Sequence, residues 1–443
     1  MSFPTKNIFQ DTTNKYPKLL VLSNNSLSEN NSNGRTLSGF LKGWQKDKIA
    51  QIYTSGEMPE SKVCDNFYRI TDKELIKDFF HKNRIGNKVS NNFEIIPNQV
   101  LSSKRIKKSI LTMILRDILW GTNIWWNKSL KEWLYDFSPD ILLFFAGESV
   151  FTYKIAMKIA RFCNIPIVVY NSEGYYFKEK NYLKNGSIIS DILYPFFHMN
   201  FKKVFKKFMK KAYYTVYIND KLKNDYDRDL GLPSVTIYTA SEVIPKIKNE
   251  VNKIPRISYL GNLGVGRHVP LCEIAEALYE INNDYKLDIY GIIPNVNVKK
   301  AFDNCKAINY CGVISYSEVV DIMYQSDLLV HGEAFSKFTR WDLKYAFTTK
   351  IADSLSSGTC FFLYAPEDLA CSEYLKNNRS AIVVTDKSKL KEELEKILTN
   401  DEIRNEYIKK GIEIAELNHN SKKNCEKFQS ILFEAVKNED NAD

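Results

Sequence analysis

The residues best suited to chemistry form a glycine-rich turn, YLGNLGVGR, from Tyr259 to Arg267. An apolar run leads into this turn and a helical pattern follows it. Such a turn lets backbone N–H groups close on a phosphate, with the positive end of the helix behind them. Gly264 and Gly266 are the candidate contacts, and Arg267 adds a guanidinium fork suited to a diphosphate. The motif is neither a P-loop nor a dinucleotide fingerprint. An ordinary tight turn is the alternative.

A second group of polar residues follows the apolar run 327–331. It begins with Glu333, followed by Ala334 and Phe335, and continues after a polar stretch with Lys350 and Asp353. If that stretch is a loop, Glu333 and Asp353 can meet although they share no helix face. A surface loop with an exposed lysine is the alternative.

The helix expected from Thr349 onwards would give this second group a positive end. Thr348 or Thr349 can cap its first turn, and Gly358 would end it. Its N-terminal turns, together with Lys350, would form a second positive site facing the glycine turn.

Two acids in the first half of the chain follow apolar runs in the same way. Glu148 follows the run 141–147, and Glu173 follows the run 165–170. Either could orient or deprotonate an acceptor hydroxyl. A solvated acid at the end of a strand is the alternative for each.

The elements that must position these residues alternate between short apolar runs and helical patterns. Continuous Val, Ile, Leu and Phe runs indicate strands buried on both faces, as in parallel sheets. The pattern predicts an α/β fold with helices on both faces of each sheet. The expected strands are 18–23, 49–54, 141–147, 165–170, 214–218, 257–261, 287–291, 327–332, 359–364 and 381–385.

The expected strands fall into two sets, and a polar segment with two prolines, 241–256, lies between them. We therefore predict an N-terminal domain over 1–245, a C-terminal domain over 246–420 and a final helix over 421–443, able to cross back. Ligands of open α/β sheets bind at the carboxyl ends of the strands, so two facing domains would form a cleft.

Composition excludes several classes of protein. A charged fraction of 26% and a hydrophobic fraction of 44% are typical of a globular chain. The net charge of +9 falls short of a nucleic-acid binder. The eight cysteines and five histidines show no metal-ligand spacing, so we expect no metal site and reduced thiols. We see no signal peptide and no membrane span, and expect a cytoplasmic protein.

Four segments together resemble a known family: YLGNLGVGR, YGIIP, CGVISYSEVVDIMYQSDLLVHGEAF and FTTKIADSLSSGTCFFLYAPED. They are similar to the nucleotide-sugar-binding domain of family 4 glycosyltransferases from bacterial capsule and cell-wall polysaccharide clusters. The resemblance implies the GT-B fold, with two Rossmann-like doubly wound domains. It also implies sugar transfer from a UDP- or GDP-sugar to a glycan acceptor that is often lipid-linked.

The resemblance also implies roles for individual residues. Glu333 would lie near the donor sugar, Asp353 would bind the ribose hydroxyls and Arg267 would contact the diphosphate. Gly291 and Gly312 would lie in the loops that contact the base, after strands 287–291 and 306–312. Thr349 would lie beside Lys350, and Gly34 in an acceptor-side loop at 33–35. Family members need no metal or other cofactor and mostly retain anomeric configuration.

The sequence departs from the family pattern at several points. Asp353 replaces the second glutamate of the family's pair, and an insertion widens the spacing. The family's lysine shortly after the arginine is absent, and we expect Lys350 to take its phosphate role. No histidine matches the one expected in the N-terminal cleft, which leaves the stereochemistry open.

A basic segment at 201–213 has Phe201, Phe205 and Phe208 on one helical face among six lysines. A helix of this kind can dock on anionic lipid at the cytoplasmic face of a membrane. An ordinary surface helix whose apolar stripe belongs to the core is the alternative.

The sequence leaves two further functions open beside glycosyl transfer. A GT-B epimerase would convert the nucleotide sugar itself, and an inactive partner subunit would keep the fold without turnover. The sequence identifies neither the sugar, the acceptor nor the oligomeric state.

Overall fold

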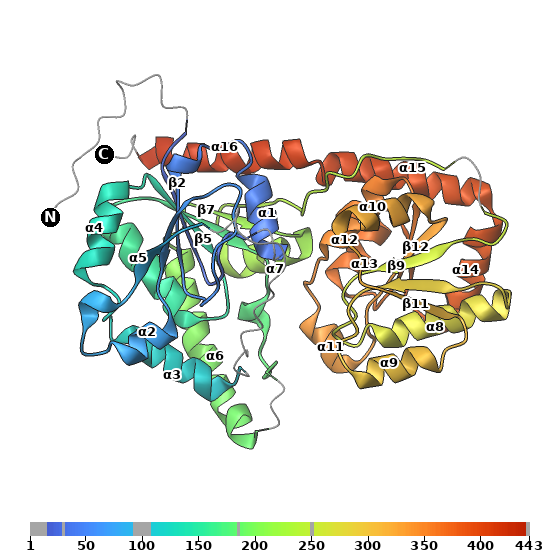
Figure 1. Ribbon diagram of the computed structural model, residues 1–443, viewed down its shortest axis with the longest axis horizontal. Helices are drawn as coiled ribbons and strands as arrows, with labels where there is room; N and C mark the ends of the chain where they lie inside the picture. Colours follow the sequence, from blue (N-terminus) through green and yellow to red (C-terminus); the bar gives the residue numbers. More distant parts are fainter. Residues whose placement is uncertain (1–15, 29–31, 92–107, 184–186, 249–251, 440–443) are drawn as a thin grey trace. The chain divides into compact units, whose positions relative to one another are not determined.

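The computed structural model describes residues 16–28, 32–91, 108–183, 187–248 and 252–439 (Figure 1). The chain divides into two compact units. Unit 1 comprises Met1–Ile237 and Cys425–Asp443, and unit 2 comprises Tyr238–Asn424.

Unit 1 is built on an eight-stranded sheet in the order β4-β3-β2-β1-β5-β6-β7-β8. Every pairing is parallel except that of β3 with β4. The strands are β1 (Leu19–Ser23), β2 (Ile49–Tyr53), β3 (Asn66–Arg69), β4 (Asn87–Val89), β5 (Ile141–Phe145), β6 (Ile167–Asn171), β7 (Tyr214–Tyr217) and β8 (Ser234–Thr236).

Helices cover both faces of this sheet. Phe40 of α1 and Phe428 of α16 stack on each other and belong to the core on one face. On the other face, Phe144 of β5 packs edge-on against Tyr153 of α5 and Phe208 of α6. The helices are α1 (Ser32–Phe40), α2 (Asp72–Lys77), α3 (Ile110–Gly121), α4 (Lys128–Phe137), α5 (Val150–Cys163), α6 (Ile188–Met209), α7 (Asp220–Leu230) and α16 (Ser421–Glu439), which begins in unit 2.

Unit 2 has a six-stranded, all-parallel sheet in the order β11-β10-β9-β12-β13-β14. Chain order reverses between β9 and β12, so the carboxyl ends of these two strands form the switch point at which open α/β sheets bind ligands. The strands are β9 (Ile257–Leu260), β10 (Leu287–Tyr290), β11 (Ile308–Gly312), β12 (Leu328–Gly332), β13 (Cys360–Tyr364) and β14 (Ile382–Val384).

The helices of unit 2 form a layer on each side of its sheet. The core on one face is closed by side chains of α8, α9 and α14, while α10 and α12 lie on the other face (Figure 1). The helices are α8 (His268–Ile281), α9 (Val296–Asp303), α10 (Tyr316–Gln325), α11 (Lys337–Asp342), α12 (Thr349–Ser357), α13 (Ala370–Asn378), α14 (Leu390–Thr399) and α15 (Asp401–Asn418).

The expected α/β architecture with two parallel-sheet units is confirmed, and each strand expected from the sequence is present. The strands β3, β4 and β8 were not expected. They have three or four residues each, and β4 and β8 lie at the edges of the sheet. Their sequences, NFYR, NKV and SVT, each contain two polar residues, so no continuous apolar run marks them.

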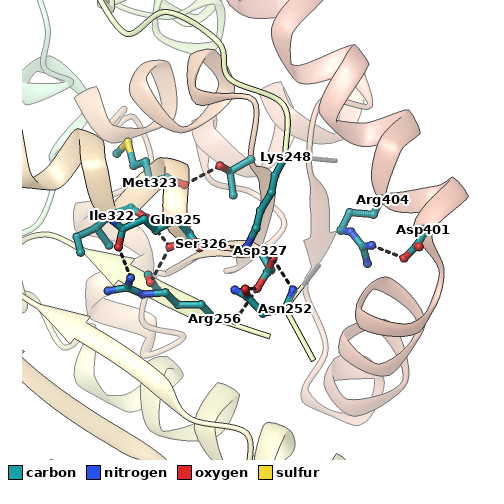
Figure 2. Close-up of polar contacts among 12 residues, drawn as sticks. Lys248, Asn252, Arg256, Ile322, Met323, Gln325, Ser326, Asp327, Asp401 and Arg404 are labelled. Carbon is teal, nitrogen blue, oxygen red and sulfur yellow. Dashed lines mark hydrogen bonds and ion pairs between the residues drawn. The ribbon is translucent and has the colours of Figure 1, made fainter. Parts of the chain in front are cut away.

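A buried carboxylate fixes the segment that enters β9. Asp327, just before β12, accepts hydrogen bonds from Lys248 Nζ, Asn252 Nδ2 and the Arg256 backbone N–H, each at 2.8 Å (Figure 2). Its side chain is almost fully buried. This network lies at the amino ends of β9 and β12, so it holds these two central strands in place from the end opposite the switch point.

The basic segment at 201–213 differs from the membrane-docking expectation. Residues 188–209 form one helix, α6, and its side chains Phe201, Phe205 and Phe208 are buried in the core of unit 1. The apolar stripe predicted to meet lipid is therefore part of the core. Within the described residues no helix is long and apolar enough to cross a membrane.

Candidate functional site

The glycine turn lies where the sequence predicts it, at the carboxyl end of β9. The Gly261 N–H donates to the Tyr290 carbonyl at 2.8 Å, and Asn262 Oδ1 accepts from the Gly264 N–H at 2.7 Å. Val265 and Gly266 both have positive φ angles, 58° and 78°. A β-branched residue in this conformation is uncommon and costs about 1–3 kcal/mol. The rest of the unit therefore holds the turn in a specific shape.

Close backbone approaches bring neighbouring loops against this turn. A Cβ atom built on Gly291 would lie 1.9 Å from the Gly261 carbonyl oxygen, so only glycine fits there. A Cβ atom on Gly266 would lie 3.2 Å from Ala334 Cβ. The loops after β9, β10 and β12 thus meet at one edge of the sheet, as expected for Gly266, Gly291 and Ala334.

Arg267 and Glu333 form a two-point ion pair across this edge. Arg267 Nε donates to Glu333 Oε2 at 3.0 Å and Nη2 to Oε1 at 2.8 Å. The exposed fraction is 12% for the Arg267 side chain and 4% for Glu333. Paired donors and acceptors of this kind combine charge with fixed geometry. The pair therefore fixes where the guanidinium lies at the switch point.

His331, for which the sequence indicated no role, completes this group. Its Nε2 lies 3.0 Å from Glu333 Oε1, and its ring stacks on Tyr259 of β9. Burial lowers the pKa of His331. Nε2 carries the proton in this contact, because a carboxylate only accepts. His331 lies in β12 and Glu333 directly follows this strand, two positions later. This spacing, which places both side chains on one face of extended chain, is the signal that could have identified His331.

Burial alone would raise the pKa of Glu333. The hydrogen bond and charge of His331, together with the charge and hydrogen bonds of Arg267, outweigh burial and lower the pKa to about 2. Glu333 is therefore ionised throughout the physiological range, and this negative charge is positioned next to the Arg267 guanidinium.

Helix α12 supplies the next two candidates from its first turns. Thr348 is the residue that caps the helix, accepting from the Lys350 N–H at 3.4 Å, and Gly358 ends it in the left-handed conformation, as predicted. A Cβ atom on Gly261 would lie 2.1 Å from Lys350 Cε, so the lysine side chain lies directly over the glycine turn. The cation of α12 is thereby brought to the turn after β9.

Asp353 lies one turn further along α12 than Lys350, on the same face. Its Oδ1 accepts from Ser241 Oγ at 2.6 Å, and Tyr316 Oη lies 3.5 Å away. A meeting of Asp353 with Glu333 was expected only if the stretch between them were a loop, and that stretch contains helix α11. Ser241 was expected in the linker 241–256, and nothing local in the sequence links it to Asp353.

The remaining candidates of unit 2 lie around this edge. Phe335 follows Ala334 and packs its ring against Tyr364 of β13. Thr349 is the first residue of α12, and Gly312, the last residue of β11, has a φ of 85°. Within the described residues no group of three or more His, Cys, Asp or Glu side chains could hold a metal ion.

The three candidate residues of unit 1, Gly34, Glu148 and Glu173, lie at different elements and have different surroundings. Gly34 lies in the first turn of α1 rather than in a loop, and a Cβ atom there would lie 2.1 Å from the Ser28 carbonyl oxygen. Glu148 follows β5, pairs with Lys108 and accepts from Tyr182 Oη at 2.7 Å. Glu173 follows β6 and is exposed.

Comparisons with known proteins agree with this architecture. Residues 267–430 match the family model described as glycosyl transferase-like. This segment is therefore similar to glycosyltransferase domains, and it contains the motifs that carried the resemblance in the sequence. No match was found among the curated proteins.

Solved structures show the same fold at low identity. HepE from Anabaena in complex with UDP-glucose has a TM-score of 0.58 and 10% identity, covering 95% of this chain and 100% of that one. Sucrose-phosphate synthase from Thermosynechococcus elongatus has a TM-score of 0.58 and 11% identity, with coverage of 95% and 99%. A glycosyltransferase from Rickettsia africae has a TM-score of 0.57 and 15% identity, with coverage of 96% and 100%. The expected GT-B fold is confirmed.

Proposed function

We propose that this protein transfers a sugar from a nucleotide diphosphate sugar to a glycan acceptor, with a UDP-sugar as the favoured donor. The observation that carries the proposal is the cation pair of Arg267 and Lys350 at the glycine turn of the β9–β12 switch point. The glycosyl transferase-like match over 267–430 and the UDP-glucose held by HepE support it. The acceptor proposed is a lipid-linked or cell-surface glycan.

The chemistry requires stabilisation of a leaving group. When the bond between the anomeric carbon and the diphosphate oxygen breaks, negative charge develops on the diphosphate and positive charge on the sugar. Arg267, Lys350 and the N–H groups of the glycine turn are proposed to hold the diphosphate. Fixed donors of this kind do the work that a metal ion does elsewhere, so the proposed reaction is metal-independent.

The two acids of unit 2 take different roles in this proposal. Glu333 fixes the Arg267 guanidinium through two hydrogen bonds and carries a negative charge next to the place proposed for the sugar. Asp353 is proposed to accept hydrogen bonds from the ribose hydroxyls, with Ser241 holding its carboxylate. Gly291 and Gly312 lie in the loops proposed to contact the base.

Unit 1 is proposed to bind the acceptor. Glu148 or Glu173 would take the proton of the attacking hydroxyl as the new glycosidic bond forms. Gly34 would let the backbone at Ser28 pack against the N-terminal turn of α1, which shapes the loop proposed to lie on the acceptor side. Retention of the anomeric configuration and a place at the cytoplasmic face of a membrane belong to the same proposal.

The direct test is calorimetry of the purified protein with UDP-glucose and a panel of other UDP- and GDP-sugars. A donor that binds also raises the melting temperature, because it stabilises the folded state by mass action. Arg267→Ala should abolish the heat of binding. Arg256→Ala is the matched control, because Arg256 also has an acidic neighbour, Asp288 at 3.6 Å, but lies at the other end of β9.

Three outcomes would contradict the proposal. Absence of nucleotide-sugar binding by the wild type would exclude it. Equal binding by the wild type and Arg267→Ala would exclude the assigned site. Conversion of the donor to another nucleotide sugar without any acceptor would indicate an epimerase in place of a transferase.

A further inference from the structure

The exposed face of helix α6 is apolar along its N-terminal half. Four side chains at spacings of three or four residues point away from the core of unit 1: Ile188, Ile192, Phe196 and Met199, which are 76%, 61%, 64% and 65% exposed. Ile189 is exposed beside them. The opposite face of the helix holds the buried side chains Tyr194, Phe197 and Phe201. An outward stripe this apolar is unusual for a helix that meets only water.

The same exposed face becomes cationic in the C-terminal half of α6. Continuing the spacing from Met199 reaches Lys203, Lys206 and Lys207, which are all exposed. Residues 201–213 contain six lysines and no acid. One helix face therefore presents an apolar half followed by a positively charged half.

Helix α3 adds a second apolar stripe. Leu111, Leu115 and Ile118 occupy one face of the helix at spacings of four and three residues, and all three are more than half exposed. Helix α3 packs against both α5 and α6, and α5 packs against α6 (Figure 1). The two exposed apolar stripes therefore lie on helices that pack directly against each other.

The lysines of α6 outnumber the acids of these two helices, Asp117 and Asp191. Asp117 of α3 accepts from the Phe151 N–H at 3.1 Å, and Asp191 of α6 accepts from Asn181 Nδ2 at 2.6 Å. Both carboxylates are therefore engaged within unit 1. The surface formed by the exposed residues of α3 and α6, called here the α3/α6 surface, is thus apolar and positively charged.

We propose that the α3/α6 surface docks on an anionic lipid bilayer, with the apolar stripes among the acyl chains and the lysines of α6 at the headgroups. Interfacial helices combine these two features. A second copy of the chain is a poorer occupant, because two such surfaces would bring lysine-rich segments of the same charge together. The inference deepens and rests on the proposed function, since a lipid-linked acceptor is presented at a bilayer.

The test is co-sedimentation of the full chain with vesicles of phosphatidylcholine, with and without phosphatidylglycerol. The wild type should bind the vesicles containing phosphatidylglycerol. Ile192→Glu with Phe196→Glu should weaken this binding by about tenfold or more, since it removes the apolar contact. Lys203→Glu with Lys207→Glu should weaken binding to the vesicles that contain phosphatidylglycerol. Binding to vesicles of phosphatidylcholine alone should not change.

Leu417→Glu is the matched control, because Leu417 is 65% exposed on α15 and lies outside the surface. It should bind vesicles like the wild type. Calorimetry with UDP-glucose on each variant separates this inference from the proposed function. Vesicle binding without donor binding would overturn only the function, and donor binding without vesicle binding would overturn only the membrane surface.

Vesicle binding by Ile192→Glu with Phe196→Glu that equals the wild type would also overturn the inference. The inference would also be overturned if the wild type formed concentration-dependent dimers and bound no vesicles, while Ile192→Glu with Phe196→Glu stayed monomeric. That result would show a contact between copies.

Discussion

The side chain of Lys350 lies across the backbone of Gly261, although the two residues belong to different elements of unit 2. A Cβ atom on Gly261 would lie 2.1 Å from Cε and 2.9 Å from Nζ of Lys350. The absence of a side chain at position 261 is therefore what lets the lysine reach the turn. The glycine at position 261 and the N-terminus of α12 are therefore both needed to place a cation at the switch point.

We predict that Gly261→Ala displaces Lys350 and lowers the rate of sugar transfer by about 10²-fold, the typical cost of losing one fixed donor. Steady-state kinetics with the donor identified by calorimetry measures this change. Gly39→Ala is the matched control, because no atom lies near a Cβ at Gly39 in α1. It should keep the wild-type rate.

A double-mutant cycle sharpens this prediction. If Gly261→Ala acts by displacing Lys350, adding it to Lys350→Ala should cost little more than Lys350→Ala alone. Additive losses would show that the methyl group at position 261 acts in another way.

The stability of the protein should depend on pH through Glu333. Its pKa is about 2 in the folded protein, against 4.5 for an ordinary glutamate. Because the folded pKa is the lower one, ionised Glu333 stabilises the fold above pH 4.5, and this contribution disappears as the pH falls towards 2. The free energy of unfolding should lose about 3 kcal/mol from this group over that range.

Urea unfolding of the wild type and of Glu333→Gln at several pH values between 7 and 3 measures this effect. Glu333→Gln should be less stable at pH 7, because Arg267 loses its charged partner, and the difference should shrink as the pH falls. Parallel curves for the two proteins would contradict the assigned pKa.

Asp353 should matter for donor affinity. We predict that Asp353→Ala weakens UDP-glucose binding by about tenfold or more, since hydrogen bonds to a charged group are worth about 1.5–3 kcal/mol. Ser241→Ala should have a smaller effect in the same direction, because it removes the hydroxyl that holds Asp353 Oδ1.

Calorimetry measures the loss of UDP-glucose affinity in Asp353→Ala and in Ser241→Ala. Asp303→Ala, at the exposed end of α9, is the control and should bind as the wild type does. Unchanged affinity in Asp353→Ala would remove this residue from the donor site.

Glu148 should act on the acceptor and leave the donor untouched. We predict that Glu148→Gln lowers transfer by about 10²-fold or more, the scale of general-base catalysis, with unchanged UDP-glucose affinity. Glu173→Gln is compared in the same assay, because Glu173 is the other acid proposed for this role. A loss in Glu173→Gln alone would assign the base to that residue.

The sequence predicted the elements better than the contacts between them. Apolar runs of five or more residues, such as Ile141–Phe145, have the length and composition of buried strands, and so were located correctly. The glycine turn and the cap at Thr348 are local patterns and were also found. The pairing of Arg267 with Glu333 joins residues 66 positions apart, and no local pattern specifies it.

Helix α6 shows a second limit of sequence patterns. The spacing of Phe201, Phe205 and Phe208 predicted an apolar stripe correctly, but spacing does not tell a core from a lipid surface. Burial in unit 1 decides between the two. The exposed apolar residues lie earlier in the same helix, where Ile188 and Phe196 resemble core residues in sequence.

The ion pair between Arg267 and Glu333 also limits how this chain can evolve. Loss of either partner leaves a buried charge unpaired, at a cost of about 3–5 kcal/mol. That is a large share of the 5–15 kcal/mol by which a typical domain is stable. A lineage that changes one of these residues must therefore change the other almost at once, or first gain stability elsewhere. The two positions should covary among relatives of this protein, and neither should drift alone.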